Sequence, residues 1–275
     1  MSGPLEPPHR RESVVQRVPQ KLASVPHEKV WGSPETEPWH RNPLHRHIGE
    51  IWFASSDSAP LLVKLLFTSD NLSVQVHPND AYSREHHDSR GKTEIWHILR
   101  AEPESRVAVG LRERVTPERL RDAALSGEIM ELLNWTPARP GDTFFVPAGA
   151  IHAIGGGLVL CEVQQHSDIT YRLYDYGRGR ELHLDHALAV SIPEPFAART
   201  SLPFVCQYFR ADRLTVTGYW LSGSPAQNTL YIALEGNGSI AGEPFQAGEA
   251  WEAAAGSGPF EIVSENAAFL VTAPL

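Results

Sequence analysis

Residues 141–152, GDTFFVPAGAIH, constrain the fold more than any other part of this chain. The apolar residues 144–146 predict a short strand, and Pro147 with Gly149 predicts a sharp corner directly after it. His152 then opens the next strand. Because a rigid corner of this kind fixes the direction of one imidazole, the segment predicts a β-rich fold that presents His152 to a metal.

Three other polar residues complete a candidate ligand set. Gln75 and His77 are one residue apart, so period-two alternation places both side chains on one face of a strand. Glu94 follows in a second predicted strand. With His152 these residues offer two imidazoles, a carboxylate and an amide carbonyl, which suits zinc. The amide carbonyl also favours harder ions such as manganese or cobalt, so the identity of the metal stays open.

The same residues carry a resemblance to a known family. The pattern Gly-x5-Pro-x-Gly-x2-His ending at His152 resembles the second motif of the cupin superfamily. The longer context is similar to the type I mannose-6-phosphate isomerases of the short bacterial form. The matching phrases are PLLVK (60–64), LSVQVHPND (72–80), GKTEIW (91–96), GAIHAIG (149–155), EVQQ (162–165) and TYRLYDYGR (170–178). The resemblance covers residues 29–190.

The resemblance implies a mainly β fold with two unequal parts. We expect a cupin (double-stranded β-helix) barrel with a small helical insertion, and a second, smaller cupin-like β half. The expected division is a loose N-terminal arm over 1–25, a metal-binding catalytic domain over 26–193 and a C-terminal β domain over 194–275. The helical insertion falls near 116–134. The C-terminal domain is expected to bind no metal, because it contains no histidine.

Local patterns place the individual elements. In the catalytic domain, strands are predicted over 48–53, 61–67, 72–77, 94–99, 106–109, 143–146, 151–154, 158–164 and 170–174. In the C-terminal domain they are predicted over 204–210, 214–220, 230–234 and 260–264. Thr116 and Pro117 predict the start of a helix with Leu120, Ala124 and Leu125 on its packed face. A further helix is predicted over 184–190, and residues 78–92 are expected to be a polar loop with solvated histidines at 86 and 87.

Composition narrows the class of protein. The formal net charge is −9 and no long basic cluster occurs, which argues against a nucleic acid or an anionic membrane as partner. No apolar run approaches the ~20 residues of a membrane span. The only cysteines, Cys161 and Cys206, do not suggest a disulfide scaffold, so a cytoplasmic location is expected.

The resemblance also implies an activity and roles for individual residues. It implies a metal-dependent aldose–ketose isomerase that interconverts mannose 6-phosphate and fructose 6-phosphate through an enediol-type proton transfer. Arg172 matches the catalytic arginine of the family, and Glu162 is the first candidate for the proton-transferring base. The residues that fall at phosphate- or substrate-contacting positions are Lys64, Ser73, Lys92 and Arg178.

Several alternatives stay open at this point. His166, which stands where the family usually has asparagine, is a competing base, a partner of a residue that binds the metal, or a neutral surface substitution. Glu162 is either the base or a structural carboxylate. His97 is expected to face away from the metal, because it alternates out of phase with Glu94. The expected cofactor is one zinc ion per chain, held by Gln75, His77, Glu94 and His152, with manganese or cobalt as alternatives. Another aldose or aldose phosphate as substrate, and a non-catalytic sugar-binding cupin, are the competing functions; the oligomeric state is undetermined.

Overall fold

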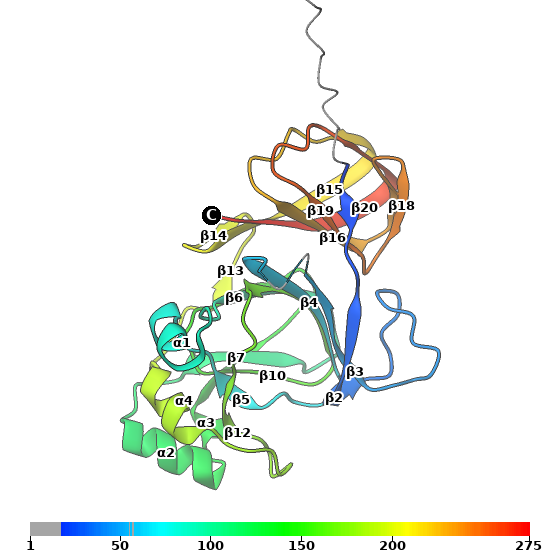
Figure 1. Ribbon diagram of the computed structural model, residues 1–275. Coiled ribbons are helices and arrows are strands. Elements are labelled where there is room, and N and C mark those ends of the chain that lie inside the picture. Colours follow the sequence, from blue (N-terminus) through cyan, green and yellow to red (C-terminus); the bar gives the residue numbers. More distant parts are fainter. Residues whose placement is uncertain (1–17, 55, 57) are drawn as a thin grey trace, which may run out of the picture.

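The computed structural model describes residues 18–54, 56 and 58–275. The described chain is built from three β-sheets and one layer of helices, stacked on one another (Figure 1). Most of the predicted arm, residues 1–17, lies outside the described residues. Its remaining part is not loose, because Gln20–Lys21 form strand β1 and pair with a strand of the C-terminal sheet.

The central layer is a seven-stranded sheet in the order β13-β9-β6-β11-β4-β2-β3. Its strands are β2 (Val25–Ser33), β3 (Ile48–Phe53), β4 (Leu61–Thr68), β6 (Glu94–Ala101), β9 (Thr143–Val146), β11 (Leu158–Gln165) and β13 (Arg199–Thr200). All residues of β4 and β11 are buried, because both faces of this sheet are covered. Alternate side chains of β4 therefore pack into two different hydrophobic cores, one on each face of the sheet.

A five-stranded sheet in the order β12-β5-β10-β7-β8 faces the central layer. Its strands are β5 (Val74–Val76), β7 (Arg106–Leu111), β8 (Leu133–Pro137), β10 (His152–Ile154) and β12 (Tyr171–Tyr174). Buried side chains fill the space between the two sheets, among them Trp96, Phe144 and Val109. Among the described residues no ladder joins the two sheets, so the expected cupin barrel takes the form of two facing open sheets, with β12 and β8 as the edges of the five-stranded one.

The helices cover the outer face of the five-stranded sheet. They are α1 (Asp80–His87), α2 (Pro117–Ser126), α3 (Ile129–Leu132) and α4 (Leu184–Val190), and none among the described residues is long and apolar enough to cross a bilayer. Helix α2 begins as predicted, since Thr116 Oγ1 accepts a hydrogen bond from Arg119 N at 3.2 Å. Its packed face contains Leu120, Ala123 and Ala124, whereas Leu125 is exposed.

Helix α1 replaces most of the predicted polar loop. Asn79 caps it by accepting a hydrogen bond from Tyr82 N at 3.0 Å, and Asp80 complements the dipole in the first turn. Ser83 is its one buried residue. The helix therefore lacks the apolar period that would reveal it in the sequence.

The C-terminal sheet has eight strands and packs on the central layer. Its strands are β1, β14 (Phe204–Val205), β15 (Phe209–Leu221), β16 (Thr229–Glu235), β17 (Asn237–Ile240), β18 (Glu243–Gln246), β19 (Ala250–Ala253) and β20 (Glu261–Pro274). Val63 and Leu65 of β4 share one core with Phe209, Ile232 and Leu270. The sheets also cross the expected domain limits, because β1 pairs with β19 and β13 pairs with β9.

Candidate metal centre and active site

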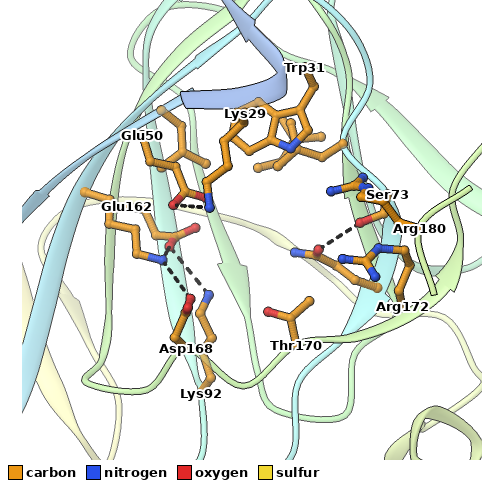
Figure 2. A pocket seen from close by; sticks show the side chains of 15 residues that line it. Lys29, Trp31, Glu50, Ser73, Lys92, Glu162, Asp168, Thr170, Arg172 and Arg180 are labelled. Atoms are coloured by element: carbon orange, nitrogen blue, oxygen red, sulfur yellow. Dashed lines mark hydrogen bonds and ion pairs between the residues drawn. The ribbon is translucent and has the colours of Figure 1, made fainter. Parts of the chain in front are cut away.

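A cavity of about 260 Å³ lies between the central and five-stranded sheets (Figure 2). Its wall is strongly charged. The cations that line it are Lys29, Lys64, Lys92, Arg172 and Arg180, and the carboxylates are Glu50, Glu162 and Asp168. A cavity of this kind suits a small polar ligand that carries negative charge.

Three buried side chains meet beside this cavity. One ligand atom each of His77, Glu94 and His152 lies within 4.8 Å of the other two. Glu94 Oε2 lies 3.7 Å from His77 Nε2, and Glu94 Oε1 lies 3.8 Å from His152 Nε2. His152 and Glu94 are the first residues of β10 and β6, so the cluster draws on both facing sheets. All three side chains are 1% exposed.

Backbone hydrogen bonds orient both imidazoles for metal binding. His77 Nδ1 lies 2.9 Å from the carbonyl of Ile169, and His152 Nδ1 lies 2.8 Å from that of Ala150. Because a carbonyl only accepts, each Nδ1 donates and each Nε2 keeps its lone pair. Burial lowers the pKa of His77 well below its ordinary value and that of His152 to about 3. Both rings are therefore neutral near pH 7, as metal ligands must be.

The surroundings of Glu94 indicate that a cation binds between Glu94 and the two histidines. Its Oε1 is buried and has no hydrogen-bond partner among the described residues. Burial and the nearby Glu162 raise the pKa of Glu94, Lys92 opposes the rise, and the resulting pKa is about 7. A divalent ion between Glu94 and the two Nε2 atoms would satisfy the orphaned oxygen and favour the ionised carboxylate. The donor set fits zinc or a neighbouring divalent transition metal.

Gln75 stands beside the cluster in the position that the sequence predicts. Strand β5 lies between β10 and β12, and the register pairs Gln75 with both His152 and Arg172. Its Nε2 lies 3.3 Å from His152 Nε2, and its Oε1 accepts from Ser73 Oγ at 3.2 Å. Ligation through the amide oxygen would therefore require a half-turn of this amide, after which Ser73 would accept from its nitrogen.

Glu162 is the centre of a buried charge network on the central sheet. Register places it directly opposite Lys64 on one side and Trp96 on the other. Glu162 Oε1 lies 3.7 Å from Lys64 Nζ and 3.5 Å from Lys92 Nζ, and Trp96 Nε1 donates to Oε2 at 3.0 Å. Lys92 also donates to Glu94. Burial opposes the charge of Lys92, but Glu162 and Glu94 outweigh it and raise the pKa of this lysine.

Arg172 lies across the cavity from Glu162 (Figure 2). Its Nη1 donates to the carbonyl of Glu181 at 2.6 Å, whereas its Nε is buried without a partner among the described residues. Burial and the neighbouring Arg180 lower the pKa of Arg172. The free donor and the like-charged neighbour both favour an anionic group of a ligand at this point of the wall.

Of two arginines in one loop, Arg180 lines the cavity, whereas Arg178, to which the resemblance gives a substrate-contacting position, does not. Arg178 donates to the carbonyl of Asn71 at 2.9 Å, lies 3.0 Å from Asp175 Oδ1, and is not among the residues that line the cavity. Arg180 lines the cavity and is held by Asp175 through its Nε at 2.7 Å. Ser73, Lys64 and Lys92 do line the cavity, as predicted.

The sequence reasoning assigned no role to several other residues of the wall. Lys29 Nζ lies 3.2 Å from Glu50, which also accepts from Trp52 Nε1 at 2.7 Å. Alternation along β2 carries a usable signal here, because Lys29 faces inward whereas Val30 is 64% exposed. Asp168, 3.8 Å from Lys64, lies in a loop where no such periodicity applies.

Two histidines that the sequence singled out lie away from the cavity wall. The Nδ1 of His166 lies 3.0 Å from the carbonyl of Ala59. The Nδ1 of His97 lies 2.9 Å from Thr143 Oγ1, on the opposite face of β6 from Trp96. The expectation that His97 faces away from the metal cluster is therefore confirmed.

The mainly β fold, with a buried His-Glu-His cluster beside a charged cavity, is that of a metal-binding cupin. Comparison with known proteins identifies the family within this class. Mannose-6-phosphate isomerase ManA of Bacillus subtilis is 37% identical over 242 residues, which cover 79% of this chain and 76% of that protein. Mannose-6-phosphate isomerase of Streptococcus mutans is 42% identical over 207 residues, 68% of this chain and 65% of that protein. The chain belongs to the mannose-6-phosphate isomerase family.

Solved structures agree with this assignment. The crystal structure of mannose 6-phosphate isomerase from Bacillus subtilis superposes with a TM-score of 0.82 at 25% identity, covering 93% of this chain and 99% of that one. A zinc-bound mannose 6-phosphate isomerase shares the fold, with a TM-score of 0.72 at 15% identity over 94% of this chain and 100% of that one. No family model matches the chain.

Proposed function

We propose that this chain is a metal-dependent mannose-6-phosphate isomerase, which interconverts mannose 6-phosphate and fructose 6-phosphate. The observation that carries the proposal is the buried cluster of His77, Glu94 and His152 beside a cavity lined by Glu162 and Arg172. The ManA relative supports the same activity. A free aldose as substrate would leave the buried Nε of Arg172, which has no partner among the described residues, without an anionic group to bind, so the phosphorylated sugar is the better match.

His77, Glu94 and His152 would hold one zinc ion, with the amide oxygen of Gln75 as a fourth donor. Zinc is supported by the donor set and by the zinc-bound relative; manganese and cobalt remain alternatives. When bound, the ion would supply Lewis acidity to the carbonyl and hydroxyl oxygens of the sugar. Lys92 donates to Glu94 and so holds this carboxylate toward the cavity.

Glu162 is the proposed base for the proton that moves between the first two carbons of the sugar. Its Oε2 is fixed by Trp96, and its Oε1 faces two lysines. The carboxylate takes the proton from the second carbon and returns it to the first, while the hydroxyl proton of the second carbon passes to the carbonyl oxygen of the first, so no net charge is gained. Arg172, with its unpartnered Nε, stabilises the negative charge that develops on the sugar oxygens.

The phosphate group is proposed to lie on the wall that carries Ser73, Arg172 and Arg180 (Figure 2). Arg180 lines the cavity and donates to Asp175 through both Nε and Nη2, so Nη1 is the donor left for the phosphate. Lys64 and Lys92, which lie beside Glu162, are proposed to contact the sugar hydroxyls. Arg178 stays a substrate-contacting candidate on the resemblance alone, because its guanidinium is already engaged by Asp175 and Asn71.

The cytoplasm is the proposed location. Both cysteines are free, and Cys161 is buried in the core between the central and C-terminal sheets. A reducing compartment suits unpaired cysteines of this kind.

A coupled assay for fructose 6-phosphate tests the proposal. The protein is assayed with mannose 6-phosphate before and after chelation, and then with zinc, manganese and cobalt added back. Activity that disappears with the chelator and returns with one of the ions is the expected result. Metal-loaded protein that leaves mannose 6-phosphate unchanged but converts another aldose or aldose phosphate would contradict the proposed substrate.

A further inference from the structure

A second group of histidines lies outside the cavity, on the helical layer. His86 and His87 end helix α1, and His186 lies on helix α4. The ring centroids of the three are 5.7, 6.1 and 6.5 Å apart, and all three residues are exposed. Tyr82 and Tyr171 flank them, with Tyr171 stacked on His186 at 4.9 Å. Because Tyr171 alternates with Arg172 along β12, this group faces away from the substrate cavity.

Hydrogen bonds to the two tyrosine oxygens leave one nitrogen open on each of two rings when the imidazole is the donor. Tyr82 Oη lies 2.9 Å from His186 Nδ1, and Tyr171 Oη is hydrogen-bonded to His87 Nε2. When an imidazole donates to the tyrosine oxygen, its other nitrogen keeps a lone pair, as in histidine ligands that are oriented by a hydrogen bond. Among the described residues, His87 Nδ1, His186 Nε2 and both nitrogens of His86 have no hydrogen-bond partner.

Ring contacts with Tyr82 and Tyr171 hold the three imidazoles together, whereas the hydrophobic core does not. They lie on the water-exposed side of two helix ends, where histidine contributes little to the core. Imidazoles gathered at this distance can offer several nitrogens to one divalent ion, which would then join α1 to α4.

We propose that His86, His87 and His186 form a second binding site for a divalent transition metal, with zinc, nickel or copper as the class of ion. The nitrogens of the three rings do not converge in this structure, so binding of a common ion requires the exposed side chains to rotate. The set contains imidazoles alone, which favours these metals over calcium or magnesium. This site is independent of the proposed isomerase activity, since none of its ligands lines the cavity.

Metal uptake by untagged protein tests the proposal. The protein is stripped with a chelator, titrated with zinc against a chromophoric chelator, and its metal content is measured per chain. The wild type is expected to take up two ions in separate steps. The double variant His86→Ala/His186→Ala is expected to keep the first ion and its isomerase activity, and to bind the second at least tenfold more weakly.

The control is His45→Asn, which removes an exposed histidine elsewhere at a residue with φ of 47°, where asparagine is tolerated. This variant is expected to keep both ions. Uptake of a single ion by the wild type would overturn the proposal, and so would a second ion that the double variant binds as tightly as the wild type. Far-UV circular dichroism of the double variant should match that of the wild type, because both positions are exposed.

Discussion

The stability of this protein should depend on pH through His97, which lies between the central and C-terminal sheets. The residue is 4% exposed. Among the described residues, the only hydrogen bond of its ring joins Nδ1 to Thr143 Oγ1. Burial, reinforced by the positive charge of Arg213, lowers the pKa of His97 from 6.5 to about 4, against a weaker opposing effect of Asp142. The folded protein therefore keeps this ring neutral at pH values where the unfolded chain would protonate it.

The direction and size of the effect follow from this proton balance. Between pH 7 and pH 4 the unfolded chain binds a proton at His97 that the folded chain does not bind, so the free energy of unfolding falls as the pH falls. Once the pH is below both pKa values, the difference between them lowers the free energy of unfolding by about 3 kcal/mol. On lowering the pH from about 7.5 to about 5, His97 should account for a loss of about 2 kcal/mol.

Urea unfolding of the wild type and of His97→Gln measures this loss. Glutamine does not titrate and its amide can still reach Thr143, so this variant is a matched control for the wild type. Both proteins are unfolded near pH 7.5 and near pH 5 with a chelator present, so that metal release does not contribute. The wild type should lose about 2 kcal/mol more than the variant on acidification. Equal losses in the two proteins would refute the reasoning.

Three further substitutions test the candidate site. His152→Ala should lose bound metal and activity together; metal content equal to that of the wild type, measured by mass spectrometry, would remove His152 from the ligand set. Arg172→Ala should abolish turnover while metal content is unchanged, and near-normal kcat would exclude Arg172 from the mechanism. Glu162→Gln should lower kcat by about 10²–10⁴-fold with a small change in KM, because general-base catalysis contributes on this scale. A loss confined to KM in the coupled assay would instead mark Glu162 as a binding residue.

Much of the catalytic part of the chain could be predicted from local sequence. The bounds predicted for β3, β9 and α4 agree with the structure, because each is set by an apolar run and by turn residues beside it. The cluster of His77, Glu94 and His152 was also predicted and is found. Period-two alternation and the corner before His152 determine which way these side chains point, and neither depends on distant contacts.

Other features depend on pairings between distant residues. Strand β1 exists because Gln20–Lys21 meet β19, more than two hundred residues later in the chain. The two sheets around the cavity are separate because no strand of one pairs with a strand of the other among the described residues, which the cupin motif does not reveal. Helix α1 was missed for a local reason, because its polar residues show no apolar period.

The sequence by itself therefore predicted the cluster of His77, Glu94 and His152, the family and most strands, since these follow from motifs and from short-range periodicity. The tertiary structure decided which charges surround the ligands. Arg178 and Arg180 lie in a loop where Gly177 and Gly179 both have positive φ, so alternation cannot say which arginine enters the cavity. That choice depends on Asp175, which holds Arg180 toward the cavity and Arg178 against the loop.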